Sequence, residues 1–137
     1  MKQVIFACTQ SASRSQIAAS LFNVLCDPKK IRAVAIGAAP QPKVNPGLAH
    51  VMGEVGVELT MLRASVVAAD LAGAETLLVT LGDDGTNSNI SATEHLQWPL
   101  RDPIGKTRAE MISIREEIKA KIIRLAKTRG WLADEFS

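Results

Sequence analysis

The sequence predicts an α/β fold in which a parallel sheet carries helices on both faces. Short apolar runs of strand length alternate with longer segments whose apolar residues recur every three or four positions. This alternation is typical of βαβ units, whose parallel strands are joined by right-handed crossovers. The chain of 137 residues has the size of one domain, and we expect residues 1–137 to form a single one.

Four segments have the apolar character of buried strands. They are residues 4–7, 31–36, 75–81 and 95–100. Gly37 ends the second of them, and a polar loop of residues 82–93 follows the third. Aromatic residues make up only 4% of the chain and tyrosine is absent. We therefore expect an aliphatic core.

Helical spacing predicts the segments that join these strands. They are residues 14–26, residues 46–55 and residues 107 to about 128, and a short further helix is expected after Ser65. Asp27 and Pro28 end the first helix. Asn45 can cap the second, and Gly56 is its natural C-cap.

The loops after the first, third and fourth strands are expected at one edge of the sheet, where ligands of such folds bind. The third-strand loop contains Asp83 and Asp84, which lack the spaced ligands of a calcium loop. His50 and His95 are isolated and have no zinc-site spacing. No metal site is predicted.

The loop between the first strand and the first helix has the features of an oxyanion site. It reads Cys8-Thr9-Gln10-Ser11-Ala12-Ser13-Arg14-Ser15. Its backbone N–H groups can form an anion nest, and the helix N-terminus adds partial positive charge. Arg14 can pair with a tetrahedral oxyanion, and the same field favours the thiolate of Cys8, to which Ser15 could donate a hydrogen bond. This pattern predicts an oxyanion-binding loop with Cys8 as the nucleophile; the alternative makes Cys8 a small buried hydrophobe and Arg14 a surface charge.

Bulk properties exclude several other classes. The net charge is only +2, which argues against a nucleic acid or a membrane surface as a partner. The apolar start is too short for a signal peptide, and no stretch reaches the roughly 18 apolar residues of a membrane span. Two cysteines do not make a disulfide scaffold. We expect a cytoplasmic protein with no bound cofactor.

Several segments resemble one known family. Val4-Ile5-Phe6-Ala7-Cys8, followed by Arg14-Ser15-Gln16-Ile17-Ala18-Ala19, looks like the start of the low-molecular-weight protein tyrosine phosphatase superfamily, and is most similar to its arsenate reductase branch. The segments Gly37-Ala38-Ala39-Pro40, Val44-Asn45-Pro46, Thr80-Leu81-Gly82 and Trp98-Pro99-Leu100-Arg101-Asp102-Pro103 agree in order. The resemblance runs from about residue 3 to residue 127. It implies a three-layer sandwich around a four-stranded parallel sheet in the order 2-1-3-4.

The resemblance also implies roles for individual residues. Cys8 would attack phosphorus or arsenic, while Arg14 and the loop N–H groups would hold the oxyanion. Asp102 would act as the general acid that protonates the leaving oxygen. Without the resemblance, Asp102 reads as a turn residue before Pro103.

Two activities of the family make different demands. A tyrosine phosphatase needs aromatic residues near its leaving group, whereas Ile104 and Gly105 follow Asp102-Pro103 here. An arsenate reductase needs a second thiol. The segment 82–89 lacks the cysteines of the thioredoxin-coupled branch, and Cys26 lies roughly 18 Å away along the first helix. We therefore expect an arsenate reductase of the thiol-coupled type, in which a low-molecular-weight thiol or a redoxin supplies the second sulfur, with hydrolysis of small phosphate esters as the alternative.

The loop departs from the family pattern at three positions. Ser11 stands where the family usually has Asn, Gln10 where the phosphatase branch has Gly, and Ser13 where Gly or Cys is usual. Ser11 adopts a left-handed backbone less readily than Asn. These changes leave open a third possibility, a non-catalytic oxyanion-binding or regulatory module.

Overall fold

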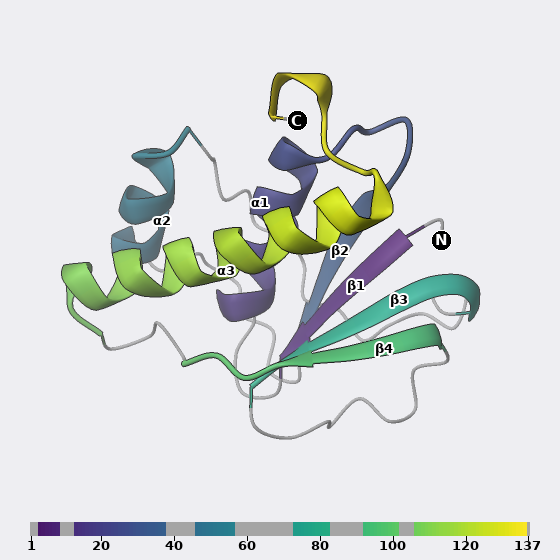
Figure 1. Ribbon diagram of the computed structural model, residues 1–137. Coiled ribbons are helices and arrows are strands. Elements are labelled where there is room, and N and C mark those ends of the chain that lie inside the picture. Colours follow the sequence, from purple (N-terminus) through teal and green to yellow (C-terminus); the bar gives the residue numbers. More distant parts are fainter. Residues whose placement is uncertain are drawn as a thin grey trace.

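The computed structural model describes residues 3–8, 13–37, 46–56, 73–82, 92–101 and 106–136. Its elements in chain order are β1 (Gln3–Cys8), α1 (Ser13–Leu25), β2 (Arg32–Gly37), α2 (Pro46–Gly53), β3 (Gly73–Leu81), β4 (Ala92–Trp98), α3 (Arg108–Arg129) and the 3-10 helix η2 (Asp134–Phe136) (Figure 1). The four strands form one parallel sheet in the order β2-β1-β3-β4. The predicted α/β class and strand order are thus confirmed.

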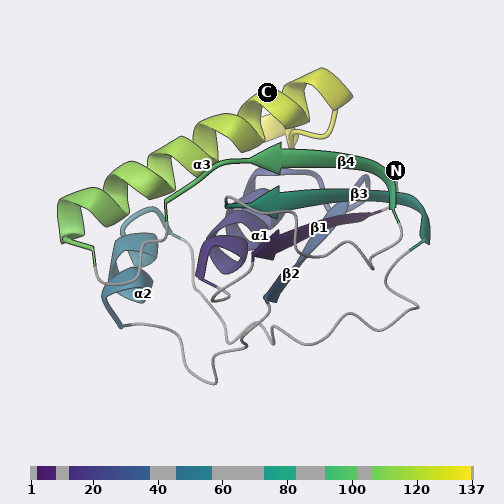
Figure 2. The ribbon, with the colours of Figure 1, turned by 90° about the horizontal axis from the view of Figure 1, so that it is seen from below.

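The carboxyl ends of the strands meet along one edge of the sheet, as the parallel arrowheads in Figure 2 show. Cys8, the last residue of β1, lies opposite Gly37 of β2 and Leu81 of β3. Leu81 in turn lies opposite Trp98, the last residue of β4. The ends of all four strands are therefore in register, and the residues that follow them start from one line.

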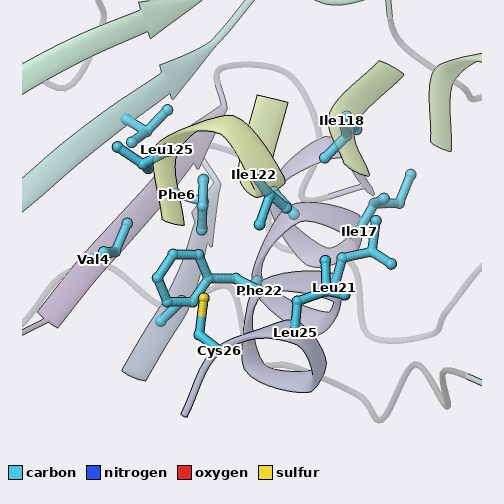
Figure 3. Close-up of a cluster of buried hydrophobic side chains, with 14 of the residues drawn as sticks. Val4, Phe6, Ile17, Leu21, Phe22, Leu25, Cys26, Ile118, Ile122 and Leu125 are labelled. Atoms are coloured by element: carbon cyan, nitrogen blue, oxygen red, sulfur yellow. The ribbon is translucent and has the colours of Figure 1, made fainter. Parts of the chain in front are cut away.

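Helices α1 and α3 cover one face of the sheet and enclose the main core. Figure 3 shows Val4 and Phe6 of β1 facing Phe22 of α1, with Ile122 of α3 closing the cluster. The opposite face carries a smaller buried group, Ile5, Ala7 and Leu78. The helix expected after Ser65 lies outside the described residues.

The core is not purely aliphatic, which corrects the expectation from composition. Trp98, Phe6, Phe22 and Trp131 form a continuous series of ring contacts, with successive centroids 5.8, 5.7 and 6.0 Å apart. The chain contains only three Phe and two Trp residues. Four of these five rings lie in this one series, in which edge-to-face and tilted contacts add stabilisation to the burial of the rings.

Strand β4 differs from its predicted bounds at both ends, and helix α2 ends earlier than predicted. Strand β4 begins at Ala92 and ends at Trp98 rather than spanning residues 95–100. Near its start the Thr93 hydroxyl accepts the backbone N–H of Glu75 at 2.6 Å, at the place where the register between β3 and β4 shifts. Helix α2 ends at Gly53, and a turn continues to Gly56, which has φ +76°.

Helix α3 begins and ends with local capping interactions. The Thr107 hydroxyl accepts the N–H of Glu110, and the Glu110 carboxylate accepts the N–H of Thr107. The bond from the Thr107 N–H to the Glu110 carboxylate, and then the bond that the Thr107 hydroxyl donates to the same oxygen, lower the pKa of Glu110 below its usual value. Gly130 ends the helix with φ +73°. Among the helices of the described ranges, none combines the length and apolar character that crossing a membrane requires.

Candidate oxyanion site at the end of the central strand

Cys8 ends β1, and Ser15 lies in the first turn of α1. The Cys8 thiol donates a hydrogen bond to Ser15 Oγ, with 3.3 Å between sulfur and oxygen. Both residues are fully buried. If the sulfur is ionised, the same pair is joined in the other direction, because a thiolate can only accept and the hydroxyl then donates. The structure thus brings together the two residues that the sequence placed at either end of the loop.

Arg14 is buried as well, with only 6% of its surface exposed. Its Nη1 donates to the carbonyl oxygen of Leu100 at 2.8 Å. Its Nε is buried and has no hydrogen-bond partner within the described part of the chain. A surface charge would behave differently, since an arginine is seldom buried without fixed acceptors. The alternative that made Arg14 a surface residue is therefore wrong, whereas Cys8 is as buried as that alternative required.

Gly82 lies against the face of the Arg14 guanidinium. A Cβ atom placed on Gly82 would be 3.0 Å from Nη1, 3.4 Å from Cζ and 3.6 Å from Nη2 of Arg14. The backbone of Gly82 has φ +121°, a conformation that residues with a side chain rarely adopt. Arg14 therefore lies between the Gly82 backbone on its face and the Leu100 carbonyl at its tip.

The end of β4 holds Gly82 in place. The Gly82 N–H donates to the carbonyl of Trp98 at 3.0 Å. The Gln97 side chain donates to the Gly82 carbonyl at 3.4 Å. The exits of β1, β3 and β4 are thus connected through direct contacts, which confirms that these three exits share one edge of the sheet.

Several predicted site residues cannot be placed. Thr9, Gln10, Ser11, Ala12 and Asp102 lie outside the described residues, and for Ser13 only the backbone is described, as the first residue of α1. The roles assigned to them remain predictions. Within the described ranges, no three His, Cys, Asp or Glu side chains are grouped so that they could hold a metal ion.

Cys26 lies in the main core, in contact with the apolar cluster between α1 and α3 rather than at the rim (Figure 3). Only 1% of its surface is exposed. Burial raises the pKa of its thiol to about 11, an effect that the nearby charge of Arg32 only partly opposes. Cys26 is therefore a protonated core residue at neutral pH and is not available as a second reactive thiol.

The sequence interpretation missed two partners of Arg14. Leu100 accepts the hydrogen bond from Arg14 through its backbone carbonyl. Every residue type has such a carbonyl, so the sequence gives no sign of this contact. Gly82 did leave a signal, because a glycine at the exit of a buried strand often marks the close approach of another group. The pattern of polar residues around it indicates only a loop.

Comparison with known proteins agrees with this geometry. The model of the family "Low molecular weight phosphotyrosine protein phosphatase" matches residues 3–131. An arsenate reductase of Bacillus cereus is 29% identical over 131 residues, which cover 93% of this chain and 96% of that protein.

Two solved structures share the fold. An arsenate reductase in the phosphate-binding state superposes with a TM-score of 0.74 at 23% identity and covers 93% of this chain and 98% of its own. The thioredoxin-dependent arsenate reductase of Corynebacterium glutamicum has a TM-score of 0.71 at 23% identity, over 93% of this chain and 61% of its own. The family match spans nearly every described element, so the chain belongs to the low molecular weight phosphotyrosine protein phosphatase family, and its relatives there include arsenate reductases.

Proposed function

We propose that this protein is an arsenate reductase-like enzyme that uses the Cys8 thiolate and takes its second sulfur from an external thiol. The observation that carries the proposal is the buried guanidinium of Arg14 beside the end of β1, with its Nε free of any partner in the described part of the chain. A buried, fixed cation with a donor of this kind is suited to a tetrahedral oxyanion. The relatives named above include arsenate reductases and one structure in a phosphate-binding state.

The first chemical step joins arsenic to sulfur. The Cys8 thiolate attacks arsenic, an As–S bond forms, and one arsenate oxygen leaves as water after it has taken up protons, with arsenic still As(V). Ser15, whose oxygen lies 3.3 Å from the Cys8 sulfur, stabilises the thiolate before the attack. Arg14 and the N–H groups of residues 9–15 hold the remaining oxygens.

The second step transfers two electrons to arsenic. An external thiolate attacks the Cys8 sulfur, an S–S bond forms, and the As–S bond breaks with its electron pair left on arsenic, which departs as arsenite. A further thiol then reduces the mixed disulfide and restores Cys8. The buried, protonated Cys26 cannot fill this role, so the sulfur comes from a low-molecular-weight thiol or a redoxin. We place the reaction in the cytoplasm, where such thiols stay reduced.

Asp102 is proposed as the general acid that protonates the leaving oxygen. It follows Leu100, whose carbonyl is bound to Arg14, by two residues. Each residue spans about 3.8 Å between Cα atoms. The contact between Leu100 and Arg14 therefore supports a place for Asp102 near the proposed oxyanion.

The test is production of arsenite from arsenate with several thiol donors. The wild-type protein should produce arsenite, Cys8→Ser should not, and Arg14→Lys should lose about 10²- to 10³-fold in kcat/KM because the fixed donor to the oxyanion is lost. Cys26→Ala is the matched control for the other cysteine and should keep the wild-type rate. Absence of arsenite above the Cys8→Ser background with every thiol would end the reductase proposal.

A second candidate is a phosphatase acting on small phosphate esters. The family model favours it, and it needs only one reactive cysteine, which is what the burial of Cys26 leaves available. Hydrolysis of p-nitrophenyl phosphate without any added thiol, lost in Cys8→Ser, would select this candidate. A protein that binds phosphate but supports neither reaction would be the non-catalytic module.

A further inference from the structure

We infer that Gly82 is a positioning residue for Arg14: the bare backbone at the exit of β3 fixes the guanidinium in its oxyanion-binding orientation. The inference rests on the proposed role of Arg14 and extends it to a residue 68 positions away in the sequence. It concerns how the binding site is built, since Gly82 itself carries no side chain that could touch the substrate.

The contact geometry shows how closely the two groups fit. A Cβ on Gly82 would meet three atoms of the same guanidinium, Nη1 at 3.0 Å, Cζ at 3.4 Å and Nη2 at 3.6 Å. These distances place the added Cβ over the flat face of the group rather than at one edge. The guanidinium could yield to a methyl group only by moving away from β3.

Such a movement is restricted by the other contact of Arg14. Its Nη1, the atom nearest to the added Cβ, is also the atom that donates to the Leu100 carbonyl at 2.8 Å. A shift away from Gly82 therefore strains or breaks this hydrogen bond and turns Nε away from its present direction. Because Arg14 is 6% exposed, there is little solvent-filled space to absorb the change.

Gly82 is itself fixed from the other side. Its N–H donates to the Trp98 carbonyl and its carbonyl accepts from Gln97, so both of its polar groups are bound to the end of β4. The ends of two adjacent strands thus position the guanidinium. Gly82, after β3, lies against its face, and Leu100, after β4, provides the acceptor at its tip. The orientation of Arg14 is set before any anion arrives, which lowers the cost of binding one.

The test compares anion binding in Gly82→Ala and in two control glycines. Titration calorimetry with inorganic phosphate and with arsenate should show a loss in affinity of about 10- to 100-fold for Gly82→Ala, because a displaced guanidinium no longer meets the oxyanion. Gly56→Ala and Gly130→Ala are matched controls. Both glycines have positive φ, +76° and +73°, and have nothing within 4 Å of an added Cβ. They should lose stability but keep the wild-type affinity.

A double-mutant cycle shows whether the effect passes through Arg14. In an Arg14→Lys background there is no guanidinium for the new methyl group to displace, so Gly82→Ala should cause no further loss of affinity. A full loss in that background would contradict the inference, as would wild-type affinity in the single Gly82→Ala variant.

A measurement on the wild-type protein covers the case in which Gly82→Ala does not fold. Side-chain NMR of ¹⁵N-labelled arginine should show Arg14 Nε ordered and its guanidinium rotating slowly without any anion. Free rotation would contradict the inference. If the wild-type protein binds neither phosphate nor arsenate, the proposed function fails instead, so the two failures are distinguishable.

Discussion

The two cysteines of this chain are both buried, but their surroundings differ. The Cys8 thiol is hydrogen-bonded to the Ser15 hydroxyl at the edge of the sheet. Ser15 directly follows Arg14, whose guanidinium is positively charged. Cys26 lies among apolar side chains of the core, and burial raises its pKa to about 11. A single residue type therefore serves as the proposed nucleophile at one end of α1 and as a packing residue at the other.

Cys26 should make the protein less stable in alkaline solution. The folded state raises the pKa of its thiol from the ordinary 9.0 to about 11, so the stability it contributes is present below pH 9 and is lost as the pH rises through 11. Two pKa units correspond to a loss on the order of 1–3 kcal/mol. Urea unfolding between pH 8 and 11 should show this loss in the wild-type protein.

Cys26→Ala provides the comparison for that experiment. The variant should be less stable at neutral pH, because it leaves a small cavity, but it should lose less stability than the wild type on going to pH 11. The chain has no tyrosine, so no phenol titrates in this range. Parallel pH curves for the two proteins would refute the assignment.

At the residue scale, the sequence indicated that Cys8, Arg14 and Ser15 lie close together, but it did not indicate the other contacts of Arg14. The spacing of Cys8, Arg14 and Ser15 indicated an oxyanion loop, since local order within one strand-to-helix turn follows from neighbouring residues. The partners of Arg14 come from positions 82 and 100, and only the pairing of β3 and β4 brings them near. Such distant contacts depend on which strands pair, and the residues next to Arg14 in the sequence carry no information about that pairing.

At the scale of elements, one buried arginine joins α2 to α3. Arg115 of α3 is 8% exposed, and its Nη1 donates to the carbonyl of Val51 at 2.9 Å. It also forms ion pairs with Glu54 at 3.6 Å and with Glu116 at 2.8 Å. Val51 lies in the last turn of α2, where the carbonyl groups lack helical partners and carry partial negative charge. Arg115 thus caps α2 from another helix.

Replacing Arg115 should destabilise α2 more than the rest of the fold. Arg115→Met keeps the length of the side chain but removes its donors, and should cost about 1–3 kcal/mol because the buried Val51 carbonyl loses its donor. Glu54 keeps its pairs with Arg108 and His50, so the loss is expected mainly at the end of α2. Hydrogen exchange followed by mass spectrometry should show faster exchange in residues 46–56, with little change in β1. Arg124→Met, an exposed arginine of the same helix, is the control and should exchange like the wild type.

The ends of α1, α2 and α3 were predicted to within two residues, whereas both ends of β4 were misplaced, by three and two residues. The bounds of α1 and α3 could be predicted because apolar residues recur at helical spacing within each segment. β4 is an edge strand whose exposed and half-exposed residues alternate, and near its start the Thr93 side chain accepts the Glu75 N–H. A polar residue such as Thr93 reads as part of a loop when its partner strand is unknown.

At the scale of the whole molecule, the segment after α3 closes the core near the start of β2. Leu132 forms a bridge to Cys26, and Trp131 contributes its carbonyl to the N–H of Asp27. The Trp131 ring contacts Phe22 at 6.0 Å and the Arg129 guanidinium lies 5.5 Å from its centre. This segment therefore covers the end of α1 and completes the aromatic series.

Trp131→Ala should lower the free energy of unfolding by about 3–5 kcal/mol, because it removes a large buried ring and its contact with Phe22. Urea unfolding followed by far-UV circular dichroism measures this loss. Phe136→Ala is the control, since that ring lies five residues further on and is 42% exposed; its substitution should have little effect. Equal destabilisation by the two variants would show that Trp131 is not part of the core.

The fold as a whole was the most predictable level. Alternating strand and helix patterns, together with the resemblance of five segments, indicated the parallel sheet and its order, since many weak signals agree at that scale. Composition was a poor guide to the core, because it counts aromatic residues without showing that Phe6, Phe22, Trp98 and Trp131 gather in one place.

The position of β1 at the centre of the sheet has a consequence for how the protein is made. β1 is the first described strand in the chain, yet its partner β3 pairs Thr76 with Gln3, a separation of 73 residues. During synthesis the edge of β1 that pairs with β3 must therefore stay unpaired until more than half of the chain has emerged. Its open edge is then exposed to other nascent chains, so slow translation ahead of β3 should favour aggregation.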